Sequence, residues 1–276
     1  MTLPNFLVIG APKAGTTSLY VHLRAHPEIF MPELKEPRFF GYEGRGGREK
    51  FPIQTLEEYA ALFAGVAGET AIGEATPHYL IYPNAAERIR ALLPQAKLIA
   101  SLRDPVERSY SVYQMNRRNR GLNADVPFLA AIETDHNLRE TYHAMLERYF
   151  QRFPPGQLRM ILLEDLERSP ATTMRGLYAF LGVDPGFAPD LSKIANPGGE
   201  PRNRLLHRLL SDPRLRGLSR GFPEPVVERL RATRSRNLQK QPLRPEDRRK
   251  AIGFFREDIL RTQDLIGRDL SAWLSA

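Results

Sequence analysis

The chain contains no cysteine and one tryptophan among its 276 residues. Without cysteine it can form neither disulfides nor thiolate metal sites, and it suits a reducing compartment. No apolar run approaches the roughly 20 residues of a transmembrane helix. The N-terminus has no basic region followed by a long apolar segment, so we expect no signal peptide. Internal repeats and low-complexity tracts are absent as well.

Acidic side chains are outnumbered, with 32 acidic against 40 basic residues and a net charge of +8. Such a surface can attract nucleic acid, but equally an anionic small molecule or an acidic polymer. Arginines gather at "NRRNR" (116–120) and "ATRSRNLQK" (232–240). There is no long basic tail and no aromatic–basic alternation of the kind that binds single strands. The charge therefore favours an anionic ligand over nucleic acid.

Short apolar runs alternate with segments of helical periodicity along the chain. The runs predict strands within 5–10, 71–77, 96–105 and 158–164. Helices are predicted for 16–26, 56–64, 84–94, 105–118, 138–153, 170–183 and most of 244–274. This order predicts one α/β domain over residues 1–276, with a mainly parallel sheet covered by helices on both faces. The loops after the first three strands should share one cleft, because ligands bind beyond the carboxyl ends of parallel strands.

The loop after the first strand, "GAPKAGTTS", has the composition of an anion site. Gly10 and Gly15, with small alanines between them, let the backbone turn tightly and approach an anion. Successive N–H groups and the following helix N-terminus can then bind phosphate or sulfate. Thr16 or Thr17 can cap that helix, and Lys13 adds a mobile positive charge.

Two features separate this loop from an ATP-binding loop of the pattern G-x-x-x-x-G-K-[ST]. Gly10 and Gly15 have the required spacing, but Thr16 stands where the lysine should be. No apolar strand ends in a bare aspartate that could hold magnesium. Asp104 is expected to cap the next helix, with Pro105 at its first position and Glu107 completing a capping box. We therefore expect an anionic nucleotide bound without a metal.

Several motifs resemble those of sulfotransferases that use 3′-phosphoadenosine 5′-phosphosulfate (PAPS). "PKAGTTSL" resembles their 5′-phosphosulfate loop, and "LRDPVERSYSVYQ" resembles their 3′-phosphate motif. "HPEIFMPELKEPRFF", "GEATPHYL" and "IGRDLSAWL" resemble heparan-sulfate-type N- and O-sulfotransferases and their bacterial relatives. The resemblance implies a fold like that of P-loop nucleoside triphosphate hydrolases. It also implies transfer of a sulfuryl group from PAPS to a hydroxyl or amine, with release of 3′,5′-adenosine bisphosphate.

The resemblance also assigns donor-binding roles. Lys13 would neutralise the charge that develops on the leaving phosphate, and Arg103 and Ser111 would hold the 3′-phosphate. The 5′-phosphate would be held by backbone N–H groups and hydroxyls within the loop, from residues Ala14, Gly15, Thr16, Thr17 and Ser18. Arg202, in a C-terminal loop that includes "NPGGEPRNRLLHRLL", would contact a phosphate. Gly198 and Glu200 depart from the pattern of that loop.

The acceptor needs a general base, and the resemblance points to Glu36 in "ELKEPRFF". Lys35 beside it is a candidate for contacting donor or acceptor. His78 is an alternative base, because other branches of the family use a histidine. Glu74 could position the acceptor or brace the loops, while Trp273 is expected to pack in the core.

Three functions remain open on sequence alone. The resemblance favours a PAPS-dependent sulfotransferase with a carbohydrate, lipid or small-metabolite acceptor. We expect no nucleic acid partner and no metal, and, since no N-terminal membrane anchor is seen, a cytoplasmic, bacterial enzyme. The glycine spacing keeps a P-loop kinase or NTPase as the alternative. The +8 charge alone would suit a non-catalytic module that binds an acidic polymer or nucleic acid.

Overall fold

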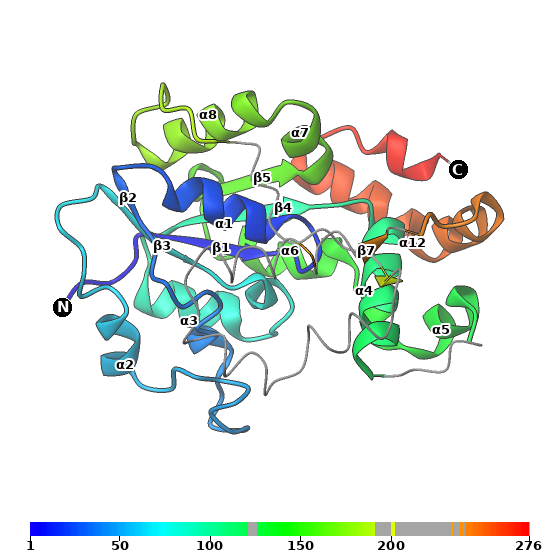
Figure 1. Ribbon diagram of the computed structural model, residues 1–276, viewed down its shortest axis with the longest axis horizontal. Coiled ribbons are helices and arrows are strands. Elements are labelled where there is room, and N and C mark those ends of the chain that lie inside the picture. The colour runs from blue at the N-terminus through cyan, green and yellow to red at the C-terminus, as the bar shows by residue number, and fades with distance from the viewer. Residues whose placement is uncertain (121–125, 191–199, 202–232, 234–237, 240, 276) are drawn as a thin grey trace.

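A parallel sheet lies at the centre of the computed structural model, which describes residues 1–120, 126–190, 200–201, 233, 238–239 and 241–275 (Figure 1). In this part of the chain the sheet has five strands in the order β2, β3, β1, β4, β5, and all neighbours pair in parallel. In chain order the strands are β1 (Phe6–Gly10), β2 (Ile29–Phe30), β3 (Ala71–Ala75), β4 (Lys97–Leu102) and β5 (Leu158–Leu162). The predicted parallel sheet is confirmed, and the short β2 was not predicted.

Helices cover both faces of the sheet, as predicted (Figure 1). Along β1, Leu7 and Ile9 join one core, and Phe6 and Val8 join the other. The first core also includes side chains of α3 (Ala85–Leu92), α6 (Tyr142–Phe150) and α12 (Pro245–Ile266). The second core is closed by α1 (Thr16–Arg24) and α8 (Pro170–Leu181). A strand buried on both faces must be apolar throughout, which explains the run "FLVIG".

The remaining elements are short or lie at the edges. They are helices α2 (Leu56–Ala61), α4 (Pro105–Arg120), α5 (Phe128–Thr134) and α7 (Leu163–Arg168), with the antiparallel pair β6 (Glu200–Pro201) and β7 (Leu238–Gln239). Five 3-10 helices among the described residues are η1 (Phe39–Gly41), η2 (Pro77–Leu80), η3 (His136–Leu138), η4 (Pro155–Gln157) and η6 (Ser271–Leu274). That residues 1–276 form a single domain stays a prediction.

One predicted helix and one predicted strand differ from the observed elements. The helix predicted for 138–153 is divided into η3 and α6, and the carboxylate of Asp258 accepts the first N–H of α6, from Tyr142, at 2.9 Å. The predicted strand 158–164 ends at Leu162, where α7 begins directly. Six residues are too few to show a helical period in the sequence, which is why α7 was missed.

The turn from β1 into α1 is made by Gly15, which is the N-cap of α1 with a left-handed φ of 75°. The predicted threonine cap is wrong, because Thr16 is already the first helical residue and no side chain caps this end. A β-carbon on Gly15 would lie 2.6 Å from Cδ1 of Leu163 on α7. Both the backbone conformation and the packing therefore require glycine here.

Replacement of Gly15 by alanine should lower the free energy of unfolding by about 1–2 kcal/mol, the cost of a left-handed non-glycine residue. Leu163 can turn its side chain away, so we expect the strained backbone to dominate. Gly156→Ala is the matched control, because a β-carbon there meets nothing within 4 Å. Urea denaturation of both variants checks the prediction, and equal stabilities would contradict it.

Candidate functional site

The loop between β1 and α1 is fastened to the end of β4. Ser101 accepts the N–H of Ala11 with its carbonyl at 2.7 Å, and its hydroxyl donates to the carbonyl of Ala14 at 2.6 Å. Nη1 of Arg103 donates to the carbonyl of Lys13 at 3.3 Å. Two of these bonds use carbonyl groups of the loop, those of Lys13 and Ala14, and the third uses the N–H of Ala11, so none of them involves an N–H group at the start of α1.

The first turn of α1 presents such N–H groups. The first intrahelical bond runs from the N–H of Leu19 to the carbonyl of Gly15 at 3.1 Å, so the N–H groups of Thr16, Thr17 and Ser18 have no partner within the helix. The N–H of Ala14 differs from the expectation, because it donates to the carbonyl of Ala11 at 3.2 Å. The site therefore begins at Gly15.

Three cationic side chains gather around this turn. Burial first, and then the charges of Arg118 and Arg103, lower the pKa of Lys13. Within the described residues Lys13 forms no ion pair, and its ammonium lies 3.8 Å from the sulfur of Met115. A half-buried ammonium next to two guanidinium groups is costly unless an anion compensates it. The cluster therefore fits an anionic ligand at the start of α1.

Helix α4 carries the second half of this cluster. Asp104 caps it as predicted, since Oδ1 accepts the N–H groups of Val106 at 2.8 Å and Glu107 at 3.2 Å. The predicted capping box does not form, because the carboxylate of Glu107 pairs with Arg103 at 3.3 Å instead. Arg103 is thereby held beside the loop.

Ser111 lies on α4 and is partly buried. Met115, which contacts Lys13, is four residues further along the helix, and Arg118 is seven residues further. Residues at this spacing share one helix face. Arg118 was missed by the sequence analysis, although its spacing from Ser111 could have indicated it. The predicted contact Arg202 lies outside the described residues.

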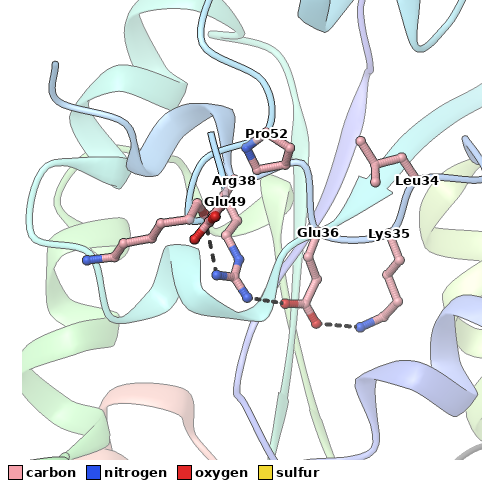
Figure 2. Close-up of a pocket in the computed structure, with 7 residues that line it drawn as sticks. Leu34, Lys35, Glu36, Arg38, Glu49 and Pro52 are labelled. Carbon is pink, nitrogen blue, oxygen red and sulfur yellow. Dashed lines mark hydrogen bonds and ion pairs between the residues drawn. The ribbon is translucent and has the colours of Figure 1, made fainter. Parts of the chain in front are cut away.

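Glu36 lies in the segment before η1 and is held on several sides. Its carboxylate pairs with Lys35 at 2.8 Å and with Arg38 at 3.2 Å, and Nδ1 of His78 lies 3.7 Å away. Figure 2 shows Lys35 and Arg38 reaching this carboxylate from opposite sides. Glu36 and Arg38 both have left-handed backbones, with φ of 62° and 58°. Each such residue costs on the order of 1–3 kcal/mol, and it persists where the surroundings hold it in place.

The electrostatics of Glu36 keep it ionised. Burial raises its pKa, but the neighbouring His78, the charge and hydrogen bond of Lys35 and the hydrogen bond from Arg38 outweigh this effect, so the pKa lies well below the ordinary value. An ionised carboxylate can accept a proton, but partners that lower its pKa also weaken it as a base. His78 lies close enough to assist Glu36, so the two candidate bases belong to one group.

A cavity of about 280 Å³ opens beside Glu36 (Figure 2). Its lining comprises Leu34, Lys35, Glu36, Arg38, Glu49, Lys50 and Pro52. The charged groups point to a polar ligand with hydroxyl, amine or anionic groups. This cavity lies on the β3 side of the site, where the N–H of Glu36 donates to the carbonyl of Ala75 at 3.1 Å. Because β3 is next to β1 in the sheet, the cavity and the Lys13 loop lie at the ends of neighbouring strands.

Glu74 at the end of β3 is buried beneath this segment, with 1% of its surface exposed. Burial raises its pKa to about 7, although hydrogen bonds from Tyr79, Thr76 and Tyr59 act in the opposite direction. The unfolded chain ionises this residue near pH 4.5, but the folded chain keeps the proton until about pH 7. The contribution of Glu74 to stability is therefore present at low pH and is lost as the pH rises through this window.

Between pH 5 and pH 8 we expect the unfolding free energy of the wild type to fall by about 2–3 kcal/mol relative to Glu74→Gln. The glutamine cannot ionise, so the difference between the two proteins isolates this one group. Urea titrations of both proteins at four pH values measure it. A difference that does not change with pH would show that Glu74 titrates alike in folded and unfolded chains.

Residues 4–188 match a family described as "Sulfotransferase family". The chain belongs to this family. The predicted family and fold are thereby confirmed, and the kinase alternative is not favoured. A sulfotransferase from Alicyclobacillus acidocaldarius has the same fold with a TM-score of 0.74 and 30% identity, over 99% of both chains.

Curated relatives match parts of the chain. A membrane-associated sulfotransferase, kil1, of Dictyostelium discoideum is 38% identical over 157 residues, which are 55% of this chain and 32% of that protein. The human bifunctional heparan sulfate N-deacetylase/N-sulfotransferase 3 is 32% identical over 202 residues, which are 67% of this chain and 23% of that protein. The chain thus spans about a third or less of these two relatives' length.

Two further observations concern the described residues alone. None of their helices is long and apolar enough to cross a membrane. No group of three or more histidine, aspartate or glutamate side chains among them is placed to hold a metal ion. Trp273 is buried as predicted, and its indole N–H also donates to Glu164 at 2.8 Å.

Proposed function

We propose that this sulfotransferase-family chain transfers a sulfuryl group from PAPS to a hydroxyl or amine of a carbohydrate or glycolipid. The observation that carries the proposal is the gathering of Arg103 and Arg118 beside Lys13, in the loop that leads into the open N–H groups of α1. Such a site suits a donor with a 5′-phosphosulfate and a 3′-phosphate. The names of the curated relatives support a carbohydrate acceptor.

In the proposed reaction the bond between sulfur and the bridging oxygen breaks, and a new bond forms from the acceptor oxygen or nitrogen to sulfur. The electron pair of the broken bond stays on the leaving phosphate, where Lys13 would stabilise the growing negative charge. The N–H groups of Thr16, Thr17 and Ser18, with the hydroxyls of the partly exposed Thr17 and Ser18, would hold that phosphate. Arg103 and Ser111 would bind the 3′-phosphate, where a guanidinium fork matches two oxygens.

Glu36 would take the proton from the acceptor as the new bond forms. Its place in the lining of the cavity puts the carboxylate within reach of a ligand there. Approach of the acceptor would displace Lys35 or Arg38 from the carboxylate, which would raise its pKa and strengthen it as a base. Lys35 or Arg38 would then be free to hold an anionic group of donor or acceptor.

Calorimetry with 3′,5′-adenosine bisphosphate in the presence of EDTA tests the donor site. We expect binding without magnesium, and binding about tenfold or more weaker for 5′-ADP, which lacks the 3′-phosphate. In Arg103→Ala the difference between the two nucleotides should shrink, because the charge that holds the 3′-phosphate is gone and Ser111 alone remains. No binding of the bisphosphate at millimolar concentration, or magnesium-dependent ATP turnover, would overturn the proposal.

The acceptor can be tested with a matched pair of oligosaccharides. Chitosan oligosaccharides offer amines and hydroxyls, whereas their N-acetylated forms offer hydroxyls alone. Incubation with labelled PAPS should label one or both, and the comparison separates transfer to nitrogen from transfer to oxygen. A cytoplasmic location in a bacterium is part of the proposal as well, and immunogold localisation in the source cells tests it.

A further inference from the structure

Glu74 is the centre of a buried hydrogen-bond network under the cavity. The hydroxyl of Tyr59 on α2 donates to Oε1 at 3.3 Å, and the hydroxyl of Thr76 donates to Oε2 at 2.9 Å. The hydroxyl of Tyr79 on η2 also faces this carboxyl group and lowers the pKa of Glu74. Burial raises the pKa of both tyrosines far above neutrality, so each remains a donor. An ionised carboxylate can accept bonds from all three hydroxyls, because it has two oxygens with two lone pairs each.

Two of these hydroxyls also accept bonds from the segment that carries Glu36. Thr76 accepts the N–H of Arg38 at 3.4 Å, and Tyr79 accepts the N–H of Phe40 at 3.5 Å. A hydroxyl that donates its single hydrogen to Glu74 keeps its lone pairs for these N–H groups. The carboxylate thus sets the direction of every bond in the network. Each accepted N–H group lies two residues after a left-handed residue, at Arg38 after Glu36 and at Phe40 after Arg38.

We propose that Glu74 is a positioning residue for sulfuryl transfer, which holds residues 34–41 in place through the hydroxyls of Thr76 and Tyr79. The inference rests on the proposed function, because the segment it holds carries the proposed base Glu36. Left-handed backbone at Glu36 and Arg38 has to be maintained by its surroundings, and the network provides that support. No atom of Glu74 needs to touch donor or acceptor for this role.

Glu74→Gln is the first test, since it keeps the size of the side chain and replaces one acceptor oxygen by a donor. The hydroxyl facing the new NH₂ group must accept a bond rather than donate one, so its own hydrogen loses its acceptor and the hydroxyl has to turn. We expect kcat to fall by about tenfold or more, because small displacements of a reacting group cost this much. Kd for 3′,5′-adenosine bisphosphate should change by less than about twofold, because none of the donor-site residues belongs to the network.

Thr76→Val and Thr76→Ser form a second pair that does not depend on whether the glutamine variant folds. Valine has the shape of threonine without the hydroxyl, and serine keeps the hydroxyl. We expect valine to lower kcat as Glu74→Gln does, and serine to restore it. Tyr178→Phe is the control, since it removes a buried hydroxyl bond to the carbonyl of His22 in the other core. A loss of equal size in Thr76→Ser or in Tyr178→Phe would overturn the positioning role.

The pH dependence of the transfer rate distinguishes a positioning role of Glu74 from a role in stability alone. The groups facing Glu74 are Tyr59 from α2, Thr76 and Tyr79 around η2, and the Glu36 carboxylate from the segment above. Of these, only Glu74 has its pKa raised to about 7, so the wild-type rate should fall as the pH is lowered through that value. A protonated Glu74 carries a hydrogen that it must donate to one of the neighbouring hydroxyls. That hydroxyl has to turn from donor to acceptor, as it does in Glu74→Gln. The Glu74→Gln profile should lack this step, and an unchanged step would contradict the proposal.

Hydrogen exchange tests whether the network holds residues 34–41, and it needs no sulfuryl acceptor. Amides in 34–41 should exchange about tenfold faster in Thr76→Val and in Glu74→Gln than in the wild type, while 6–18 stay unchanged. If the wild type transfers nothing from labelled PAPS, the proposed function fails, and the exchange result still decides whether the network holds the segment. If transfer is normal in both variants, the inference fails and the proposed function stands.

Discussion

Replacement of Lys13 by alanine should lower the rate of sulfuryl transfer by about 100- to 1,000-fold, the usual cost of removing one group that stabilises developing charge. Lys13 has a left-handed backbone and lies between two glycines, in the loop that leads into the N–H groups proposed to hold the leaving phosphate. Its pKa is lowered by burial and by two neighbouring arginines, so its charge is costly until an anion arrives. The folded state should not suffer, because alanine removes this cost.

Two matched variants make the result specific. Lys250→Ala on the exposed face of α12 removes the same side chain away from the site and should leave the rate unchanged. Lys13→Arg keeps the charge but replaces a compact ammonium by a planar fork, and we expect it to recover only part of the rate. Single-turnover transfer from labelled PAPS measures all three. A Lys13→Ala enzyme within about threefold of the wild type would remove Lys13 from the proposed mechanism.

The donor side of the site was predictable because its chemistry is local in the sequence. "GAPKAGTTS" combines small residues, a lysine and hydroxyls immediately after a buried strand, and the structure places them at the start of α1. The cap of Asp104 on α4 was predictable for the same reason. The threonine cap of α1 was wrong because a left-handed Gly15 already makes the turn, and that choice depends on the packing of distant Leu163.

The acceptor side was less predictable because its contacts join segments far apart in the chain. Glu36 could be named from a resemblance, but its pairing with Arg38 and its approach to His78 depend on a left-handed backbone. Sequence patterns carry no signal for such a conformation in residues other than glycine. The burial of Glu74, 38 residues after Glu36, likewise follows from tertiary packing. Periodicity identifies β3 but does not show which polar side chains it buries.

Glu36→Gln should lower kcat by about 100- to 10,000-fold, the range that a general base contributes. Glutamine fills the same space and can still accept bonds from Lys35 and Arg38, so the cavity should keep its shape. Binding of 3′,5′-adenosine bisphosphate should be unchanged, because the donor site lies at the end of the neighbouring strand. Glu49→Gln is the matched control, since it removes a carboxylate from the same cavity and should alter kcat by less than about threefold.

The same variant also tests the coupling of the two carboxyl groups. Burial is the main reason for the raised pKa of Glu74, and the negative charge of Glu36 raises it further. Glu36→Gln removes that charge, so the pKa of Glu74 should fall below about 7. The loss of stability with rising pH should then move to lower pH, because folded Glu74 releases its proton earlier. If the pH dependence of stability does not change, Glu36 and Glu74 are not coupled. If kcat of Glu36→Gln equals that of Glu49→Gln, the base is His78 or another group.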